Sequence, residues 1–179
     1  MIDAFMFSNS GHNLSTMLNN VDYIIKNNIT NIIISINYLG DQIKNYFKNG
    51  DSIACMKKIL LYSSMPSTSR HHWGTDIDIN SLEPSYFATG KGLKEYTWLV
   101  NNAHKFGFCQ VYDDMKKTGR TGYQEEKWHW SYLPESTKFL NEYHAKISYA
   151  DIKGFKGSNL ASKINFIPSF VDGISKKCK

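Results

Sequence analysis

Two short motifs, far apart in the chain, constrain its fold more than any other feature. Residues 69–78 read SRHHWGTDID and residues 126–129 read EKWH. Together they offer two imidazoles and one carboxylate for a metal ion, which matches a catalytic zinc site that keeps water in its fourth position. A second carboxylate is left over to take a proton from that water. We therefore expect a fold that brings both motifs to one metal ion.

The spacing within these motifs resembles a known family. The pattern SxHxxGxxxD from Ser69, followed about 50 residues later by ExWH from Glu126, is similar to the zinc D-alanyl-D-alanine carboxypeptidases and dipeptidases of the VanY and VanX type. Those enzymes trim bacterial cell-wall peptides. The resemblance extends from about Lys58 to the C-terminus. It implies one zinc ion per chain and the following site: His71, Asp78 and His129 as zinc ligands, and Glu126 as the catalytic base.

The residues of the first motif leave two alternatives open. Gly74 allows a turn, so a loop and a strand can carry His71 and Asp78 to one point. His72 could bind the metal in place of His71, although the motif spacing favours His71. Strand alternation puts Asp76 on the same face as Asp78. Asp76 could therefore replace Asp78 as a ligand, or it could orient a ligand histidine through a hydrogen bond.

In the second motif, His129 must reach the metal from a separate strand. Alternation over residues 127–132 places Ser131 on the same face as His129. Two neighbouring acids precede this strand, and only Glu126 fits the Glu-x-x-His interval. We expect Glu125 to be a solvated surface acid.

Contacts to a substrate are predicted at a few polar and aromatic positions. Relatives of this type carry an arginine before the first motif, where it steadies the substrate's carboxylate or oxyanion. The corresponding stretch, residues 35–38, has no arginine. Arg70, Arg120 or a lysine could take its place, and we expect Trp128 to line the site. The candidate substrate-binding residues are Ser69, Arg70, Arg120, Tyr123 and Trp128.

Composition sets limits on partners and location. The 179 residues fit one domain, and 41% apolar residues argue against global disorder. The net charge of +5 is mild and the chain has only two arginines, so we expect no nucleic-acid partner. No apolar run predicts a transmembrane segment, and no signal peptide is visible. The resemblance implies a peptidoglycan peptide as substrate and a periplasmic or cell-envelope location.

The cysteines give no clear pattern. Cys55, Cys109 and Cys178 are odd in number and contain no CxxC pair, which signals neither a disulfide framework nor a cysteine zinc site. We expect Cys109 to be a small core residue. One disulfide remains open if the protein is exported.

The hydrophobic pattern predicts both helices and strands, and together with the resemblance it leads us to expect an α+β fold, in which a small antiparallel sheet carrying the zinc site is flanked by helices. Expected helices cover 13–27, 41–47, 51–60, 90–105 and 134–147, and expected strands cover 29–36, 76–79, 108–112 and 127–132. We assign 1–179 to a single zinc peptidase domain, with 1–57 as a helix-strand-helix scaffold and 58–179 as the catalytic part.

Three more specific structural expectations follow from this pattern. Ile77 and Ile79 should enter the core, because they alternate with the two aspartates. The helix over 90–105 should carry Leu93, Tyr96, Leu99, Val100 and Ala103 at helical spacing. The polar stretch 113–122 should be a mobile loop beside the site.

Removal of a terminal D-alanine from a peptidoglycan stem peptide is the simplest function for such a site. The same zinc site could serve an endopeptidase or a D-alanyl-D-alanine dipeptidase. A non-catalytic, zinc-containing cell-wall peptide-binding domain is an alternative of another class, favoured by the missing arginine and disfavoured by Glu126. Residues 28–47 also look like part of a sugar-phosphate nucleotidyltransferase, but the required Gly-rich phosphate loop is absent.

Overall fold

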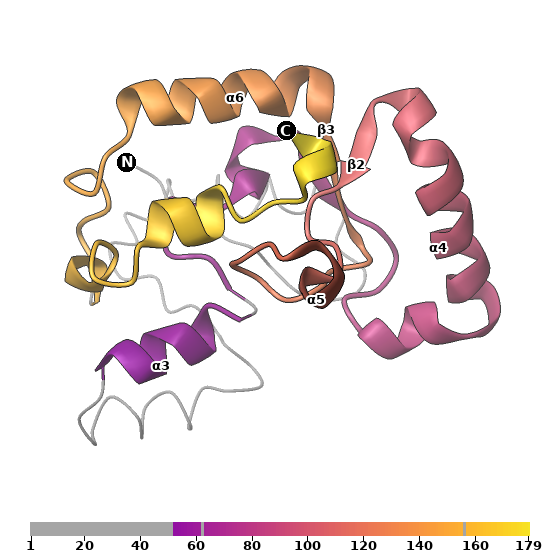
Figure 1. The fold of residues 1–179 in the computed structure, drawn as a ribbon, viewed down its shortest axis with the longest axis horizontal. Helices are drawn as coiled ribbons and strands as arrows, with labels where there is room; N and C mark the ends of the chain where they lie inside the picture. The colour runs from indigo at the N-terminus through magenta and orange to yellow at the C-terminus, as the bar shows by residue number, and fades with distance from the viewer. Residues whose placement is uncertain (1–51, 62, 156) are drawn as a thin grey trace, which may run out of the picture.

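The computed structural model describes residues 52–61, 63–155 and 157–179 (Figure 1). The helices predicted over 13–27 and 41–47, the strand over 29–36 and the arginine-free stretch 35–38 lie outside these residues. The α-helices are α3 Ser52–Ile59, α4 Gly90–Asn102, α5 Met115–Thr118 and α6 Leu133–Lys146, and the strands are β1 Asp76–Asp78, β2 Phe108–Gln110 and β3 His129–Tyr132. Shorter turns are η1 Arg70–Trp73, η2 Pro84–Ala88, η3 Ala103–Phe106, η4 Ser158–Leu160, η5 Ile167–Val171 and η6 Lys176–Cys178.

An antiparallel sheet in the order β1-β3-β2 makes the two motifs neighbours in space. Asp78 pairs with His129, and Asp76 pairs with Ser131. Residues paired across antiparallel strands share a face of the sheet. These four side chains therefore lie on one face, as alternation predicted. The predicted α+β fold, with a small antiparallel sheet flanked by helices, is confirmed.

The face of β1 that carries Ile77 is not buried. Ile77 is 45% exposed whereas Asp76 is 6% exposed, so the prediction that Ile77 enters the core is wrong. Ile79, just after β1, is half-buried. β1 is an edge strand, and its inward face carries carboxylates that are satisfied by charged and polar partners. Alternation identified which side chains share a face, but not which face is covered.

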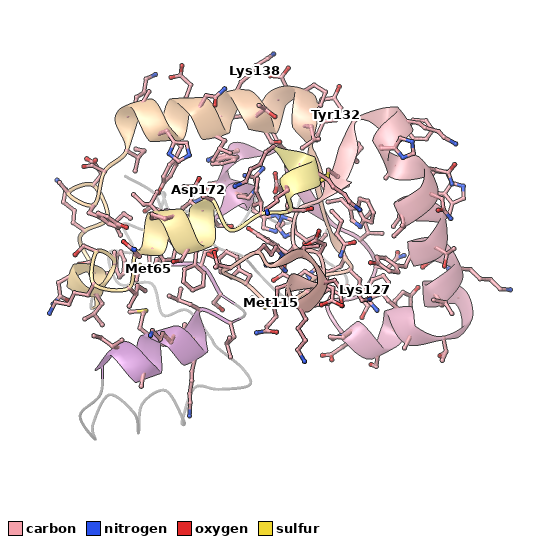
Figure 2. The ribbon with its side chains drawn as sticks, viewed as in Figure 1. Met65, Met115, Lys127, Tyr132, Lys138 and Asp172 are labelled. Atoms are coloured by element: carbon pink, nitrogen blue, oxygen red, sulfur yellow. A yellow bond between two sulfur atoms is a disulfide. The ribbon has the colours of Figure 1, made fainter. Side chains whose placement is uncertain are left out.

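The main core lies between α3, α6 and the C-terminal segment. In Figure 1, α6 runs along the top of the molecule and the C-terminal segment lies below it. The buried members of this cluster are Met56, Leu60, Met65, Tyr143, Ile152, Leu160, Ala161, Phe166 and Val171. The opposite side of α6 meets solvent, where the exposed Lys138 points outward in Figure 2. A second, smaller cluster adjoins β2 and consists of Val111, Tyr112, Tyr123, Ile174 and Cys178.

Helix α4 stands to one side of this core, at the right of Figure 1. It packs on η2 and η3, and Leu93 and Val100 are 43% and 51% exposed. Two of the apolar residues whose spacing indicated this helix are thus exposed, because their face of the helix has no covering layer among the described residues. The predicted helix also ends earlier, and its last turn continues as the 3-10 turn η3. No helix in the described part of the chain has the length and apolar character needed to cross a membrane.

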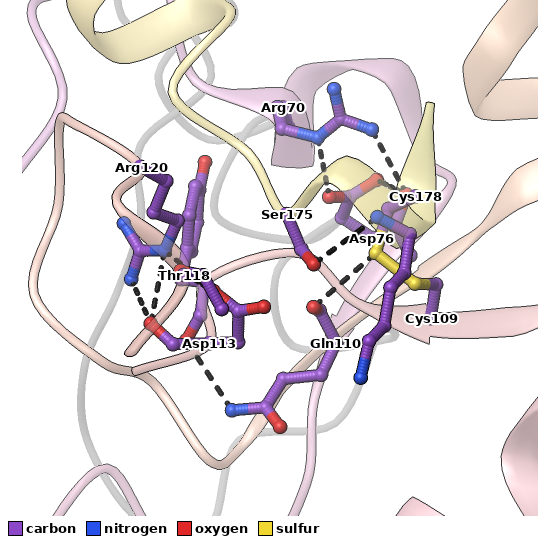
Figure 3. The surroundings of a disulfide bond; sticks show 12 residues. Arg70, Asp76, Cys109, Gln110, Asp113, Thr118, Arg120, Ser175 and Cys178 are labelled. Carbon is purple, nitrogen blue, oxygen red and sulfur yellow. Dashed lines mark hydrogen bonds and ion pairs between the residues drawn. A yellow bond between two sulfur atoms is a disulfide. The ribbon is translucent and has the colours of Figure 1, made fainter. Parts of the chain in front are cut away.

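A disulfide joins Cys109 of β2 to Cys178 near the C-terminus (Figure 3). Cys109 is partly buried against a small core cluster, and the disulfide that the sequence left open is present. The C-terminal segment returns alongside β2, where the main-chain nitrogen of Ser175 donates to the carbonyl of Val111 at 2.8 Å. The two Cα atoms are 5.8 Å apart, a usual separation for a disulfide. The disulfide thus links the C-terminal segment covalently to β2, an edge strand of the sheet.

Candidate metal centre and active site

Three side chains from the two motifs meet at one point on the inner face of the sheet. One donor atom each from His71, Asp78 and His129 lies within 4.8 Å of the other two. Oδ1 of Asp78 is 3.5 Å from Nε2 of His71 and 3.5 Å from Nδ1 of His129. Tetrahedral zinc bonds of about 2.0–2.2 Å separate neighbouring ligand atoms by roughly 3.3–3.6 Å. The two distances to Asp78 match this separation, and His72 is not a member of the group.

His71 presents its Nε2 atom to this point. Its Nδ1 lies 3.1 Å from the main-chain oxygen of Asp76. A carbonyl oxygen only accepts, so Nδ1 carries the proton and Nε2 keeps its lone pair. Nε2 is buried and has no hydrogen-bond partner among the described residues. Because buried polar atoms are normally paired, this lone pair fits a metal ligand.

Local structure fixes the position of His71. Ser69 precedes η1, and its Oγ accepts a hydrogen bond from the main-chain nitrogen of His71 at 3.3 Å, the usual arrangement at a helix N-cap. Gly74 ends the turn with φ 70, a conformation that glycine adopts at little cost. The turn predicted at Gly74 is therefore confirmed, and it leads directly into β1.

His129 presents its other nitrogen, Nδ1, to the same point. Its Nε2 lies 2.9 Å from Oδ2 of Asp76, and a carboxylate accepts the proton of that nitrogen. Nδ1 then faces Asp78 and lies 3.2 Å from Oε2 of Glu126. The His129 side chain is only 4% exposed. Each histidine thus has one nitrogen hydrogen-bonded to a partner and the other nitrogen directed at the cluster.

Asp76 lies beside the donor group and orients His129. Its carboxylate is fully buried, and it also accepts hydrogen bonds from Arg70 at 3.0 Å, Thr75 at 2.9 Å and Ser131 at 2.6 Å. Burial raises the pKa of Asp76, but the hydrogen bonds from His129 and Ser131 and the charges of Arg70 and His129 outweigh burial and hold the pKa well below its usual range. Of the two alternatives for Asp76, the geometry favours the orienting role over the ligand role.

The cluster carries an extra proton when no metal is bound. Burial raises the pKa of Asp78, but the neighbouring imidazoles of His71 and His129 lower it overall. Burial lowers the pKa of His129, whereas its hydrogen bonds to Asp76 and Glu126 raise the pKa to about 9. At neutral pH a metal ion must therefore displace one proton from His129.

Glu126 lies next to His129, one of the three candidate metal ligands. Its side chain is 13% exposed and approaches Nδ1 of His129 at 3.2 Å. Its main-chain nitrogen donates to the carbonyl of Tyr112 at 2.9 Å, and its own carbonyl accepts from the nitrogen of His129 at 3.4 Å. A carboxylate in this position can take a proton from a molecule held at the cluster.

Several predicted substrate-binding residues serve the internal structure. Arg70 is 3% exposed, and its Nη2 donates to Ser131, while its Nη1 is buried without a partner among the described residues. The hydroxyl of the buried Tyr123 donates to Ser64 at 2.8 Å. Trp128 is 8% exposed and packs near Phe87. Substrate contacts from these residues and from Ser69 remain predictions.

Arg120 organises the stretch 113–122. Its nitrogens donate to the carboxylate of Asp113 and to main-chain oxygens (Figure 3). These oxygens belong to Asp113, Thr121, Tyr123, Gln124 and Gly173. The stretch also contains the one-turn helix α5, which Asp114 caps. Because all three guanidinium nitrogens are engaged, we expect Arg120 to hold this loop rather than to bind substrate.

The sequence did not identify three partners of Asp76, namely Arg70, which was predicted to contact substrate, Thr75 and Ser131. Ser131 had been placed on the same face as His129 by alternation, and that signal could have identified it as a partner of a buried acid on the same face. Thr75 adjoins Asp76 in sequence, and its hydroxyl bond to Oδ1 had no signal in the pattern.

Comparison with known proteins identifies relatives. A family profile described as VanY, D-alanyl-D-alanine carboxypeptidase, matches residues 13–135. A D-alanyl-D-alanine carboxypeptidase of Enterococcus faecalis is 37% identical over 70 residues, which cover 39% of this chain and 24% of that relative. An uncharacterized protein of Haemophilus influenzae is 28% identical over 108 residues, covering 52% of this chain and 77% of that relative.

Similar solved structures are more distant. VanYB in complex with D-alanine-D-alanine has a TM-score of 0.38 and 22% identity, covering 73% of this chain and 80% of that chain. A mutant of the vancomycin resistance D,D-pentapeptidase VanY in complex with Zn(II) has a TM-score of 0.38 and 23% identity, covering 68% of this chain and 72% of that chain.

Proposed function

Because the chain belongs to the VanY family of D-alanyl-D-alanine carboxypeptidases, we propose that it is a zinc-dependent peptidase. Its substrates are peptide bonds at D-amino acids in peptidoglycan stem peptides, and its simplest reaction is removal of a terminal D-alanine. The enterococcal relative is described as such a carboxypeptidase, and the matched region spans 24% of its length.

One observation carries the proposal. Nε2 of His71, Oδ1 of Asp78 and Nδ1 of His129 converge, and the other nitrogen of each histidine is hydrogen-bonded. Two nitrogens and one carboxylate oxygen form a donor set typical of catalytic zinc, which leaves one coordination position for water or substrate. Hydrogen bonds of this kind on the far side of each imidazole are usual for metal-bound histidines.

The chain's own groups then divide the work. A bound zinc ion would lower the pKa of a water molecule and polarise the substrate carbonyl. Glu126 takes a proton from the attacking water and gives it to the leaving amine. Asp76 keeps the proton on Nε2 of His129, so Nδ1 is the nitrogen that would bind the metal once its own proton is displaced. The ionised Asp78 contributes the negative charge of the donor set.

The disulfide between Cys109 and Cys178 supports action in the cell envelope. Disulfides persist in oxidising compartments and are rare in the cytosol. Peptidoglycan lies outside the cytoplasmic membrane, so a peptidase that acts on it must work where this bond is stable. We therefore propose an envelope or periplasmic location.

Two other functions compete with terminal D-alanine removal. An endopeptidase or dipeptidase would use the same zinc and the same base, and would differ only in where the peptide chain is held. A binding domain without turnover would keep the metal site and would have no need of a carboxylate beside it. The position of Glu126, 3.2 Å from His129, favours a catalyst.

The test is digestion of a stem pentapeptide ending in D-Ala-D-Ala by the zinc-loaded chain, followed by mass spectrometry. Loss of one alanine supports the carboxypeptidase. Loss of the terminal dipeptide, or an internal cut, replaces it with the dipeptidase or the endopeptidase. Binding without any cut would contradict the peptidase function and favour the binding domain.

A matched pair of variants tests the base. Glu126→Gln should keep zinc and lose turnover by about 100-fold or more, because a general base contributes about 10²–10⁴-fold. Glu125→Gln changes the neighbouring acid in the same way and should retain activity. Equal rates for Glu126→Gln and the parent would show that Glu126 is not the base.

A further inference from the structure

We infer that Gln110 of β2, oriented by Tyr96 of α4, is a positioning residue that holds the turn carrying Glu126. It acts from the face of the sheet opposite the metal cluster. The inference rests on the role proposed above for Glu126, and neither Gln110 nor Tyr96 belongs to the site motifs.

The Gln110 amide joins three groups. Its Nε2 donates to the carbonyl of Glu126 at 3.2 Å and to the carbonyl of Tyr112 at 3.3 Å. Its Oε1 accepts from the hydroxyl of Tyr96 at 2.9 Å. The reversed amide would point its oxygen at two carbonyls, which only accept. The amide orientation is therefore determined by its partners, and Tyr112 and Glu126 are linked a second time by the bond between their main chains.

Gln110 reaches this turn from behind. It pairs with Trp130 across the sheet, so both side chains lie on the face away from His129. Trp130 donates from Nε1 to the carbonyl of Lys127 at 3.0 Å. Two side chains of the back face thus bind successive carbonyls of the turn. The next carbonyl, that of Trp128, accepts from the main-chain nitrogen of Ile79 at 3.0 Å.

Tyr96 connects helix α4 to the same turn in two ways. Its hydroxyl binds Gln110, and the ammonium of Lys127 lies 5.2 Å from the centre of its ring, a cation–π contact. In Figure 2, Lys127 lies toward the side of the molecule that carries α4. The helix that contributes little to the core therefore supports the residues on both sides of the Glu126 carbonyl.

Loss of the Gln110 contact should affect Glu126 more than the zinc ligands. His129 is held in β3 and by Asp76, whereas Glu126 lies before the strand, where its hydrogen bond to the nitrogen of His129 is long at 3.4 Å. Loss of the Gln110 amide should loosen the base and leave the metal donors in place. It should lower kcat, with little effect on KM or on zinc affinity.

The experiment compares three variants of the full zinc-loaded chain. Gln110→Met keeps the side-chain volume and removes the amide, and Tyr96→Phe removes only the hydroxyl that orients it. Tyr86→Phe is the matched control, because its hydroxyl binds Glu95 of α4 and does not contact Gln110. The measurements are hydrogen exchange of the Glu126 amide by NMR, zinc affinity, and kcat and KM on the pentapeptide.

Gln110→Met should speed exchange of the Glu126 amide by about 10-fold, because local opening becomes easier. It should lower kcat by about 10-fold, a usual cost of losing an outer positioning contact. Tyr96→Phe should show both effects to a smaller degree, and it serves alone if Gln110→Met does not fold. Tyr86→Phe should resemble the parent.

Three results for Gln110→Met would overturn the inference. The first is unchanged hydrogen exchange of the Glu126 amide, and the second is unchanged kcat in an active enzyme. The third is a weaker zinc affinity together with a raised KM, which would indicate a general structural role. If the parent does not cut the pentapeptide, the proposed function fails. The exchange measurement then still decides whether Gln110 holds the turn.

Discussion

Nε2 of His129 lies 2.9 Å from Oδ2 of Asp76, and this contact determines which nitrogen of His129 faces the metal point. Arg70 and Ser131 hold the same carboxylate from other sides. The imidazole is therefore in its binding orientation before any ion arrives. Carboxylate partners of this kind raise the affinity of a histidine ligand.

Replacing Asp76 by asparagine should weaken zinc binding by about 10–100-fold, the usual effect of removing such a partner. An asparagine cannot supply the charge that holds His129. The measurement is competition for zinc with a chelator of known affinity, on variants whose folding is checked by circular dichroism. Asp151→Asn, at an exposed turn, is the control and should bind zinc as the parent does. Equal affinities for both variants would contradict the orienting role.

The stability of the metal-free protein should depend on pH through His129. Its pKa is raised from 6.5 to about 9 in the folded chain, so its stabilising effect is complete below pH 6.5 and is lost as the pH rises through about 9. The expected loss is up to about 3 kcal/mol. Urea unfolding of the metal-free protein below pH 6.5 and above pH 9 measures this loss of stability. The variant His129→Gln should not show the dependence on pH. A metal-free protein that becomes more stable over this interval would contradict the assignment.

Arg120→Lys should lower the free energy of unfolding by about 2–4 kcal/mol, because lysine cannot satisfy all the carbonyls that the buried guanidinium binds. Urea unfolding measures the change. Lys117→Ala is the control, since the Lys117 side chain is 82% exposed and its removal should change stability by about 0.5 kcal/mol or less. Equal effects from the two changes would show that Arg120 does not hold the loop.

Removing the disulfide should destabilise the protein without altering the metal donors. The bond closes a loop of sequence separation 69, for which chain entropy predicts a loss of about 4 kcal/mol. Thermal unfolding of the parent with and without a reductant measures it. The double variant Cys109→Ser and Cys178→Ser should unfold at the same temperature under both conditions. A parent that is insensitive to complete reduction would contradict this prediction.

Much of the fold was predictable because local patterns carry it. The strands that include Asp76 and His129 follow a period of two, and α6 follows a helical period with Pro134 in its first turn. The exposure of Ile77 could not be predicted, because it depends on which face of an edge strand is left uncovered. The exposure of Leu93 could not be predicted either, because it depends on whether another segment covers that face of helix α4.

For the candidate site, the metal ligands could be predicted from the sequence, but the residues that support them could not. The spacing of the motifs identified His71 and Asp78 as neighbours, and the structure brings them together. The disulfide of Cys109 depends on where the C-terminal segment returns, which no local pattern records. The role of Arg120 depends on carbonyl groups of several segments, and main-chain oxygens carry no sequence signal.

The most direct test is a crystal structure of the protein grown with zinc. We predict one zinc ion bonded to Nε2 of His71, a carboxylate oxygen of Asp78 and Nδ1 of His129, with bonds of about 2.0–2.2 Å and with Glu126 beside the fourth position. An ion bound by His72 or by Asp76 instead, or no ion between His71 and His129, would contradict the account.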